Sequence, residues 1–266
     1  MRSRGMKGVD WAAHEDPSAM QSATLSPILL LRRSFELVGP IYGPLLILAS
    51  PGFIISIIAE LIPLFGGILN LAYVLIGAPI LAGAAFWLVD QHLKQRTPPL
   101  GNSLDRAVSR AVPLVFGSIL LVLIVSLGML LFVLPGIYWG VRLAFTPCAI
   151  VLEDKGTTEG LGYSWSLVKG RWWGAFWALL IFGLTVVVAF LAGNFIFGFT
   201  VGVISGVISS YDETFAEKIL EVVNVVSVTV VGNAAATAVA PILNIYTVLL
   251  FRSLQQLKGQ AVSYWG

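Results

Sequence analysis

Long apolar stretches alternate with short polar segments along almost the whole chain. A membrane-spanning helix needs about 20 consecutive, mostly apolar residues. The stretches that qualify cover residues 40–62, 65–89, 112–134, 136–152, 173–209 and 222–251. The pattern therefore predicts an all-α fold, in which a bundle of about six transmembrane helices makes up most of the protein.

The ends of the chain are polar, and this predicts a simple domain organisation. Residues 1–24 lack the apolar core of a signal peptide, so we expect a disordered cytoplasmic tail there. Residues 25–258 would form a single membrane domain, and residues 259–266 a second, short cytoplasmic tail. This division leaves no stretch for a separate soluble catalytic domain.

Two of the predicted spans have unusual lengths. Residues 173–209 would form a helix of about 55 Å, which is too long for one crossing without tilt, a break or an extension outside the membrane. Asn194 and the glycines around it are candidates for a break or a re-entrant turn. Residues 136–152 are short and contain Pro147. Seven or eight segments are therefore the alternative to six spans.

The composition agrees with lipid as the solvent over most of the chain. Of the 266 residues, 57% are hydrophobic and 11% are charged, whereas about a quarter of the residues in a soluble domain are charged. The mean hydropathy is +0.88. The net charge of +2 is too small to predict a nucleic-acid partner.

The positions of the basic residues predict the orientation in the membrane. Of the 16 Lys and Arg residues, all except Arg142 and Lys218 lie in the two tails or in loops that six spans place on one side. Basic residues of short loops collect on the cytoplasmic face. We therefore expect both termini in the cytoplasm.

Three of the polar segments have an apolar face and a helix start signal. The start signals are Ser26-Pro27, Asn102 and Thr158, in the segments after residues 25, 101 and 157. These segments predict three interfacial helices.

A few charged and aromatic residues are candidates for contacts with lipid or another anion. Glu60 and Arg142 are the charged residues clearly inside predicted spans, both expected toward the outer side. They would form a structural ion pair, or Arg142 would bind a lipid phosphate or an anionic ligand. Lys169, Arg171 and Trp172, at the entry to the fifth span, are further candidates for the same kind of contact.

Small residues and asparagines suggest how the helices pack. Gly198, Gly202 and Gly206 lie on one face of the fifth span, where they predict close helix packing, or alternatively a surface for homo-oligomer formation. The asparagines of the apolar region would line a polar pathway or form interhelical hydrogen bonds; these are Asn70, Asn194, Asn224, Asn233 and Asn244.

No motif for catalysis or cofactor binding is found in the sequence. The only histidines are His14 and His92, and there is no phosphate-binding loop, zinc-protease motif or nucleophile elbow. The acidic residues at the predicted cytoplasmic boundary are expected to be solvated or to cap helices; these are Asp90, Asp105, Glu153 and Asp154. We therefore expect no cofactor, no metal site and no enzymatic activity.

One segment resembles a known family. Leu134-Pro135-Gly136-Ile137-Tyr138-Trp139-Gly140-Val141-Arg142-Leu143, followed by Pro147 and later by Ser164-Trp165-Ser166-Leu167-Val168-Lys169-Gly170-Arg171-Trp172-Trp173, is similar to the membrane domain of bacterial glycerophosphoryl diester phosphodiesterases and of related stand-alone bacterial membrane proteins of unknown function. The resemblance implies a six-helix bundle in a bacterial cytoplasmic membrane. The phosphodiesterase is a separate soluble domain that is absent here, so its activity is not implied.

These observations lead to two functional hypotheses. The first is a non-catalytic scaffold or lipid-interacting accessory protein whose partners are membrane lipids and a membrane or cytoplasmic protein. The second is a small-solute transporter that uses the interior of the bundle. A polar cavity lined by the asparagines would favour transport, whereas a closed apolar bundle would favour the accessory role.

Overall fold

The computed structural model describes residues 26–209 and 230–263, and within these ranges it contains helices and no strand. Six helical segments, from Pro27–Ala59 to Gly232–Gly259, are long and apolar enough to cross a membrane. The predicted all-α, multi-pass architecture is thus confirmed.

The helices follow one another with short connections. In chain order they are α2 (Pro27–Val38), the 3-10 turn η1 (Gly39–Ile41), α3 (Tyr42–Leu61), α4 (Pro63–Ala72), the π-helical turn η2 (Tyr73–Gly77), α5 (Ala78–Leu93), α6 (Leu100–Ser109), α7 (Ala111–Leu131), α8 (Val133–Leu143), α9 (Thr146–Leu152), α10 (Thr157–Val168), α11 (Trp172–Ser209) and α13 (Gly232–Ser263).

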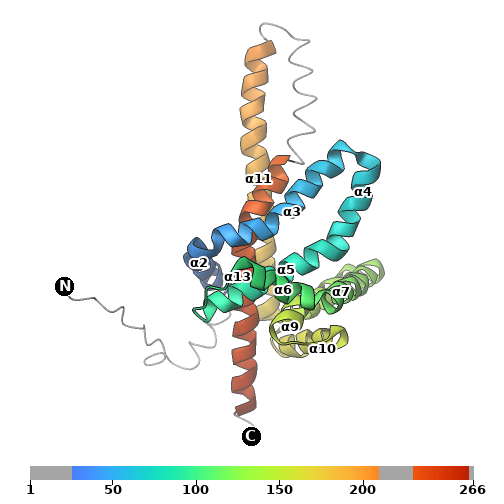
Figure 1. Ribbon diagram of the computed structural model, residues 1–266, viewed down its shortest axis with the longest axis vertical. Coiled ribbons are helices and arrows are strands. Elements are labelled where there is room, and N and C mark those ends of the chain that lie inside the picture. The colour runs from blue at the N-terminus through green and yellow to red at the C-terminus, as the bar shows by residue number, and fades with distance from the viewer. Residues whose placement is uncertain (1–25, 210–229, 264–266) are drawn as a thin grey trace, which may run out of the picture.

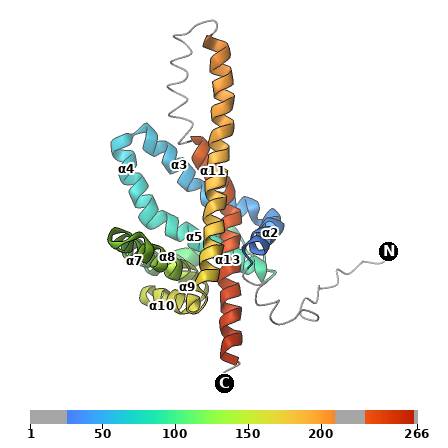
Figure 2. The same cartoon turned by 180° about the vertical axis from the view of Figure 1, so that it is seen from behind.

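Two long helices form the axis of the molecule. Helices α11 and α13 run side by side, and the α3–α4 and α7–α8 hairpins extend away from them (Figures 1 and 2). The most deeply buried side chains lie around α13, against which α3, α5 and α11 pack, and include Leu45, Phe145, Tyr246 and Phe251. The hairpin tips are exposed, with Leu130 at 84%. Lipid would cover these apolar tips. The helices are therefore packed closely around the core, whereas the hairpin tips have few protein neighbours.

The two spans of unusual length differ in their structure. Helix α11 runs without interruption from Trp172 to Ser209, and the Asn194 amide donates to the Phe190 carbonyl of the same helix at 2.9 Å. Of the alternatives left open for residues 173–209, the structure therefore shows one unbroken helix. The short fourth span is interrupted instead, because α8 ends at Leu143 and α9 begins at Thr146 with Pro147 in its first turn.

The predicted helix starts are correct once and wrong twice. Helix α2 begins at Pro27 after Ser26, as predicted. Helix α6 begins at Leu100 directly after Pro99, so Asn102 lies inside it. Helix α10 begins after Gly156, whose amide donates to the Glu159 carboxylate at 3.3 Å, so Thr158 is also internal. Proline and glycine before the expected caps set both starts.

The last described helix extends beyond the predicted end of the membrane domain. Helix α13 continues to Ser263, so the residues predicted as the short cytoplasmic tail begin within this helix, and the boundary at residue 258 remains a prediction. The predicted tail 1–24, the first part of the span 222–251, Lys218 and Asn224 lie outside the described residues.

Candidate functional site

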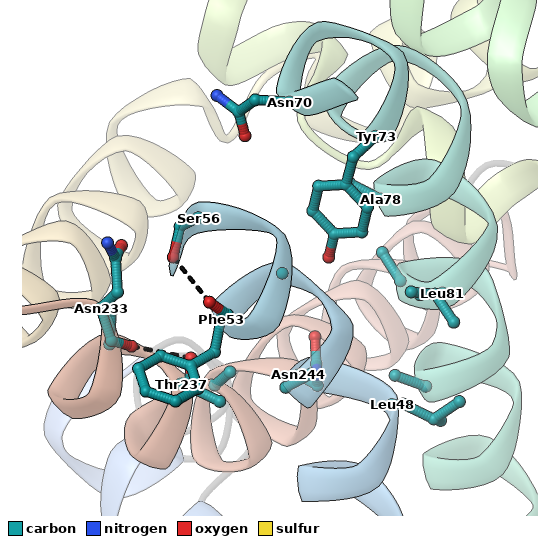
Figure 3. A pocket seen from close by; sticks show the side chains of 16 residues that line it. Leu48, Phe53, Ser56, Asn70, Tyr73, Ala78, Leu81, Asn233, Thr237 and Asn244 are labelled. Carbon is teal, nitrogen blue, oxygen red and sulfur yellow. Dashed lines mark hydrogen bonds between the residues drawn. The ribbon is translucent and has the colours of Figure 1, made fainter. Parts of the chain in front are cut away.

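A cavity of about 400 Å³ lies between α3, α4, η2, α5 and α13 (Figure 3). Its polar lining consists of amides, hydroxyls and one phenol, from Ser56, Asn70, Tyr73, Asn233, Thr237 and Asn244. Small side chains provide the space, chiefly those of Ala49, Gly52, Ala78, Ala82, Ala85, Ala236 and Ala240. We call this space the amide cavity. Its volume falls within the range of about 300–1,000 Å³ that is usual for ligand sites.

The π-helical turn η2 places Tyr73 in the wall of the amide cavity. Its end is fixed by the Ala78 amide, which donates to the Tyr73 carbonyl five residues earlier. Pro79 follows at once and has no amide hydrogen, a situation in which a π-turn readjusts the backbone. A Cβ added to Gly52 would lie 2.7 Å from the Tyr73 hydroxyl, and one added to Gly77 would lie 2.8 Å from the Tyr73 ring. The two glycines therefore make room for this tyrosine.

Helix α3 is adapted to a proline beside the amide cavity. Pro51 lies inside the helix and cannot donate to the carbonyl of Ile47. The Ser50 hydroxyl donates to that carbonyl instead, at 2.9 Å. At the other wall, the Tyr42 hydroxyl donates to the Ala238 carbonyl at 3.1 Å and joins α3 to α13. The wall can thus carry a proline without an unsatisfied backbone acceptor.

The asparagines divide into distinct groups. Asn70, Asn233 and Asn244 line the amide cavity, whereas Asn194 bonds within its own helix and Asn224 lies outside the described residues. The Asn70 and Asn244 side chains form no hydrogen bond with the part of the chain that the structure describes. Interhelical hydrogen bonds therefore do not account for these two. Unpaired amides at membrane depth are tolerated where they face water or a polar solute.

A network of charged and polar side chains joins α5, the end of α9 and α13. The Asp90 carboxylate receives hydrogen bonds from Arg252 Nε at 2.8 Å and Nη2 at 2.6 Å, and an ion pair from Lys94 at 2.6 Å. Arg252 Nη1 also contacts Glu153 at 2.6 Å and Gln255 at 2.7 Å. We call these five residues the ion network.

The ion network corrects the prediction for two of the acidic residues. Asp90 is 2% exposed and Glu153 is half-buried, so neither is a solvated boundary residue. Gln255 extends the network to the Tyr163 hydroxyl of α10 at 2.7 Å. The pairing of Asp90 with Arg252 joins residues 162 positions apart.

Asp154 forms a second ionic contact at the connection between α9 and α10. Arg106 Nη2 lies 2.8 Å from its carboxylate, and Arg110 pairs with the other carboxylate oxygen. The hydrogen bond from Arg106, supported by the charges of both arginines, lowers the pKa of Asp154 below its ordinary value. The carboxylate is half-exposed, so its contribution to stability is small.

The lowered pKa of Asp154 predicts a pH-dependent contribution to stability. The contribution is present above the ordinary aspartate pKa of about 3.9 and is lost as the pH falls through the lower pKa of the folded state. We expect Asp154→Asn to lower the melting temperature at pH 7 by about 1–3 °C. The difference from the unmodified protein should disappear at a pH well below 3.9. Melting temperatures measured in detergent over a pH series test this. Asp105→Asn, at an exposed position, is the control. A difference in melting temperature between Asp154→Asn and the unmodified protein that persists at the lowest pH contradicts the prediction.

Arg142 is held between aromatic rings. Its guanidinium carbon lies 4.8 Å from the centre of the Tyr138 ring and 4.4 Å from that of Trp165 in α10. Its buried Nε has no hydrogen-bond partner among the described residues. Contact with α10, predicted to lie on the cytoplasmic face, disagrees with the predicted outer position of Arg142. The side chain of Glu60 is outside the described part of the structure, so the ion-pair alternative remains a prediction.

The other residues predicted from the sequence to bind lipid or to pack helices do not lie together at one site. Trp172 lies close to Arg142, because its indole donates to the Tyr138 carbonyl at 3.3 Å. Arg171 donates instead to the Leu257 carbonyl of α13 at 3.0 Å, and Lys169 is exposed. A Cβ added to Gly198 would meet no atom within 4 Å. The proposed packing roles of Gly198, Gly202 and Gly206 remain predictions, since residues 210–229 are not described.

The described residues were also searched for side chains that could bind a metal ion. Within the described ranges, no group of three or more His, Cys, Asp or Glu side chains is arranged to hold a metal ion.

A family model, Domain of unknown function (DUF7847), matches residues 28–254. No curated protein and no solved structure matches the chain.

Proposed function

This chain belongs to the DUF7847 family, and we propose that it carries a small, uncharged, polar solute across a membrane by way of the amide cavity. The observation that supports this function is the presence of Asn70, Asn233 and Asn244 in one cavity between apolar helices. A closed apolar bundle would have favoured a purely structural role.

The chemistry of the lining favours an uncharged solute. Each asparagine offers two donors and a carbonyl acceptor. The Ser56 and Thr237 hydroxyls donate to the carbonyls of Phe53 and Asn233, at 2.8 and 2.7 Å, so they add acceptors for a solute. None of the residues that line the amide cavity is charged, so a charged solute would lose its hydration without gaining a counter-ion. The alanines leave space for a compact molecule such as a polyol, a sugar or an amide.

The packing on one side of the cavity supports a gated pathway. Below Asn244, along α13, the fully buried Tyr246, Leu250 and Phe251 are followed by Arg252 of the ion network. Both α5 and α13 line the cavity and also supply the ion network. Transport by alternating access requires such a closed end, which opens when the helices rock around the binding site. Under the proposed topology this closed end faces the cytoplasm.

Flux into proteoliposomes tests the proposal. We expect the unmodified protein to accelerate entry of urea, ribitol and glucose, measured by stopped-flow light scattering, and not that of lactate or glycerol 3-phosphate. Ala236→Trp places an indole in the amide cavity and should lower the rate by about tenfold, since displacing the solute costs 1.4 kcal/mol or more. Ala234→Trp, on the exposed side of α13, is the matched control and should leave the rate unchanged.

Three outcomes would overturn the proposal. The first is entry of all three uncharged probes at the rate of protein-free liposomes. The second is equal flux through the Ala236→Trp and Ala234→Trp variants. The third is faster entry of the charged probes than of the uncharged ones.

The second candidate is the non-catalytic, lipid-interacting accessory role. The specific observation in its favour is Arg142, a cation inside a predicted span that contacts two aromatic rings and no carboxylate in the described ranges. The exposed apolar hairpin tips also offer surface to lipid or to a membrane partner. This role does not compete with transport, because its residues lie apart from the amide cavity.

The membrane in which the protein lies and the orientation of its termini are part of the same proposal. We place the protein in a bacterial cytoplasmic membrane with both termini inside, on the strength of the positive-inside pattern and of the resemblance at residues 134–173 to the membrane domain of glycerophosphoryl diester phosphodiesterases. The DUF7847 match does not link the chain to those enzymes. We propose no enzymatic activity.

A further inference from the structure

We infer that the corner between α8, α10 and the start of α11 binds one anionic phospholipid, with its phosphate on Arg142 and an acyl chain in an adjacent aromatic groove. This site gives a location to the lipid-interacting role proposed as the second candidate, and it does not depend on solute transport.

The first argument is the cost of leaving Arg142 uncompensated. It contacts Trp165 of α10, the helix predicted to lie along the cytoplasmic face, and a buried cationic group without a partner is costly at this level of the membrane as elsewhere. Within the described ranges it forms neither an ion pair nor a side-chain hydrogen bond, and its Nε is buried without a partner. Contacts with Tyr138 and Trp165 stabilise the cation but satisfy none of its N–H groups. An anion is what completes this environment.

The second argument is the shape of the guanidinium. Its five N–H groups form a planar fork that matches the oxygens of a phosphate. The two rings hold this fork from the sides, because the Tyr138 and Trp165 ring planes are nearly perpendicular, at 86°. The fork is therefore ordered before an anion arrives, which lowers the entropic cost of binding.

The third argument is an apolar groove that begins at Tyr138. It has a volume of about 530 Å³ and is lined by Leu134, Ile137, Tyr138, Trp172, Trp173 and Phe176 among others. The rings form a continuous stack, in which Trp172 lies 5.8 Å from Tyr138 and 5.1 Å from Phe176, measured between centroids. Tyr138 contacts Arg142 on one side and lines the groove on the other.

These features together select the occupant. A free phosphate ion would use Arg142 and leave the apolar groove empty, whereas a neutral lipid would fill the groove and leave the cation unpaired. A phospholipid satisfies both parts at once. A head group with net negative charge is favoured over a zwitterionic one, because the site contributes a cation and the described residues around it contribute no carboxylate.

Retention of lipid tests the inference. The protein is placed in nanodiscs with equal amounts of phosphatidylglycerol and phosphatidylcholine, released into mild detergent and weighed by native mass spectrometry. We expect one retained phosphatidylglycerol, and about tenfold less of it after Arg142→Gln, which removes the fork. Trp173→Ala should also reduce retention while leaving Arg142 in place. Because Trp173 is 66% exposed, this second variant keeps the core intact if Arg142→Gln fails to fold.

The controls separate this site from general lipid affinity and from the solute pathway. Arg33→Gln removes an exposed arginine of α2 and should retain phosphatidylglycerol as the unmodified protein does. Urea and ribitol flux through the Arg142→Gln and Trp173→Ala variants should match that of the unmodified protein, so failure of either proposal can be recognised separately. Equal retention by Arg142→Gln and the unmodified protein would overturn the inference. Equal retention of the two lipids, or the same thermal stabilisation by inorganic phosphate alone as by phosphatidylglycerol, would also overturn it.

Discussion

Replacing Arg252 with glutamine is expected to destabilise the protein by about 3 kcal/mol, at the lower end of the range of 3–5 kcal/mol for breaking a buried ion pair. The Asp90 side chain is 3% exposed and would lose two of its hydrogen bonds, and Glu153 would lose its ion pair. Lys94 stays beside Asp90 at 2.6 Å, which is why the lower end applies. Unfolding of the purified protein in mixed detergent micelles, followed by circular dichroism, measures the change.

Two comparison variants identify the cause of that loss. Arg32→Gln breaks an exposed pair with Glu36 and should cost less than about 0.5 kcal/mol. The double variant Asp90→Asn/Arg252→Gln removes the buried charge together with its partner and should recover part of the stability. If Arg252→Gln costs no more than Arg32→Gln, the ion network does not hold α5 and α13 together.

The number and nature of the spans could be predicted because they depend on local sequence. In lipid each span must satisfy its own backbone hydrogen bonds, so a long apolar stretch becomes a helix whatever it packs against. The same constraint explains why α11 has no break at Asn194. Its amide bonds to Phe190 within α11, and the surrounding helix remains the best arrangement for every backbone group.

The candidate site depends on contacts that sequence position does not reveal. The asparagines were recognised as a group, but their spacing does not show that Asn70 and Asn244 face one cavity while Asn194 does not. Asp90 and Arg252 were both assigned to the cytoplasmic boundary, where solvation is the ordinary expectation for a charged residue. Their pairing follows from the packing of α5 against α13. The sequence does not show that the Asp90 carboxylate is buried and therefore needs a cation beside it.

The position of the tight glycine contact was likewise not evident from spacing alone. Spacing of four residues drew attention to Gly198, Gly202 and Gly206 in α11, yet one of the tight glycine contacts among the described helices lies in the α7–α8 hairpin. A Cβ added to Gly128 would lie 2.9 Å from Gly136 Cα, and one added to Gly136 would lie 2.7 Å from the Met129 amide nitrogen. Many glycine pairs share a spacing, but the partner helix decides which pair is needed.

Gly136→Val is therefore expected to destabilise the protein by about 3 kcal/mol, the upper end of the usual cost of overpacking. The upper end applies because the added carbon meets the backbone of Met129, which cannot move aside as a flexible side chain would. Gly140→Val is a matched control on the same helix, since its Cβ would lie 3.8 Å from Val125, an ordinary contact. Both variants introduce the same β-branched residue, so helix propensity cancels in the comparison. Unfolding in mixed micelles should separate them by at least about 2 kcal/mol; similar stability of the two variants would mean that α7 and α8 do not meet at Gly136.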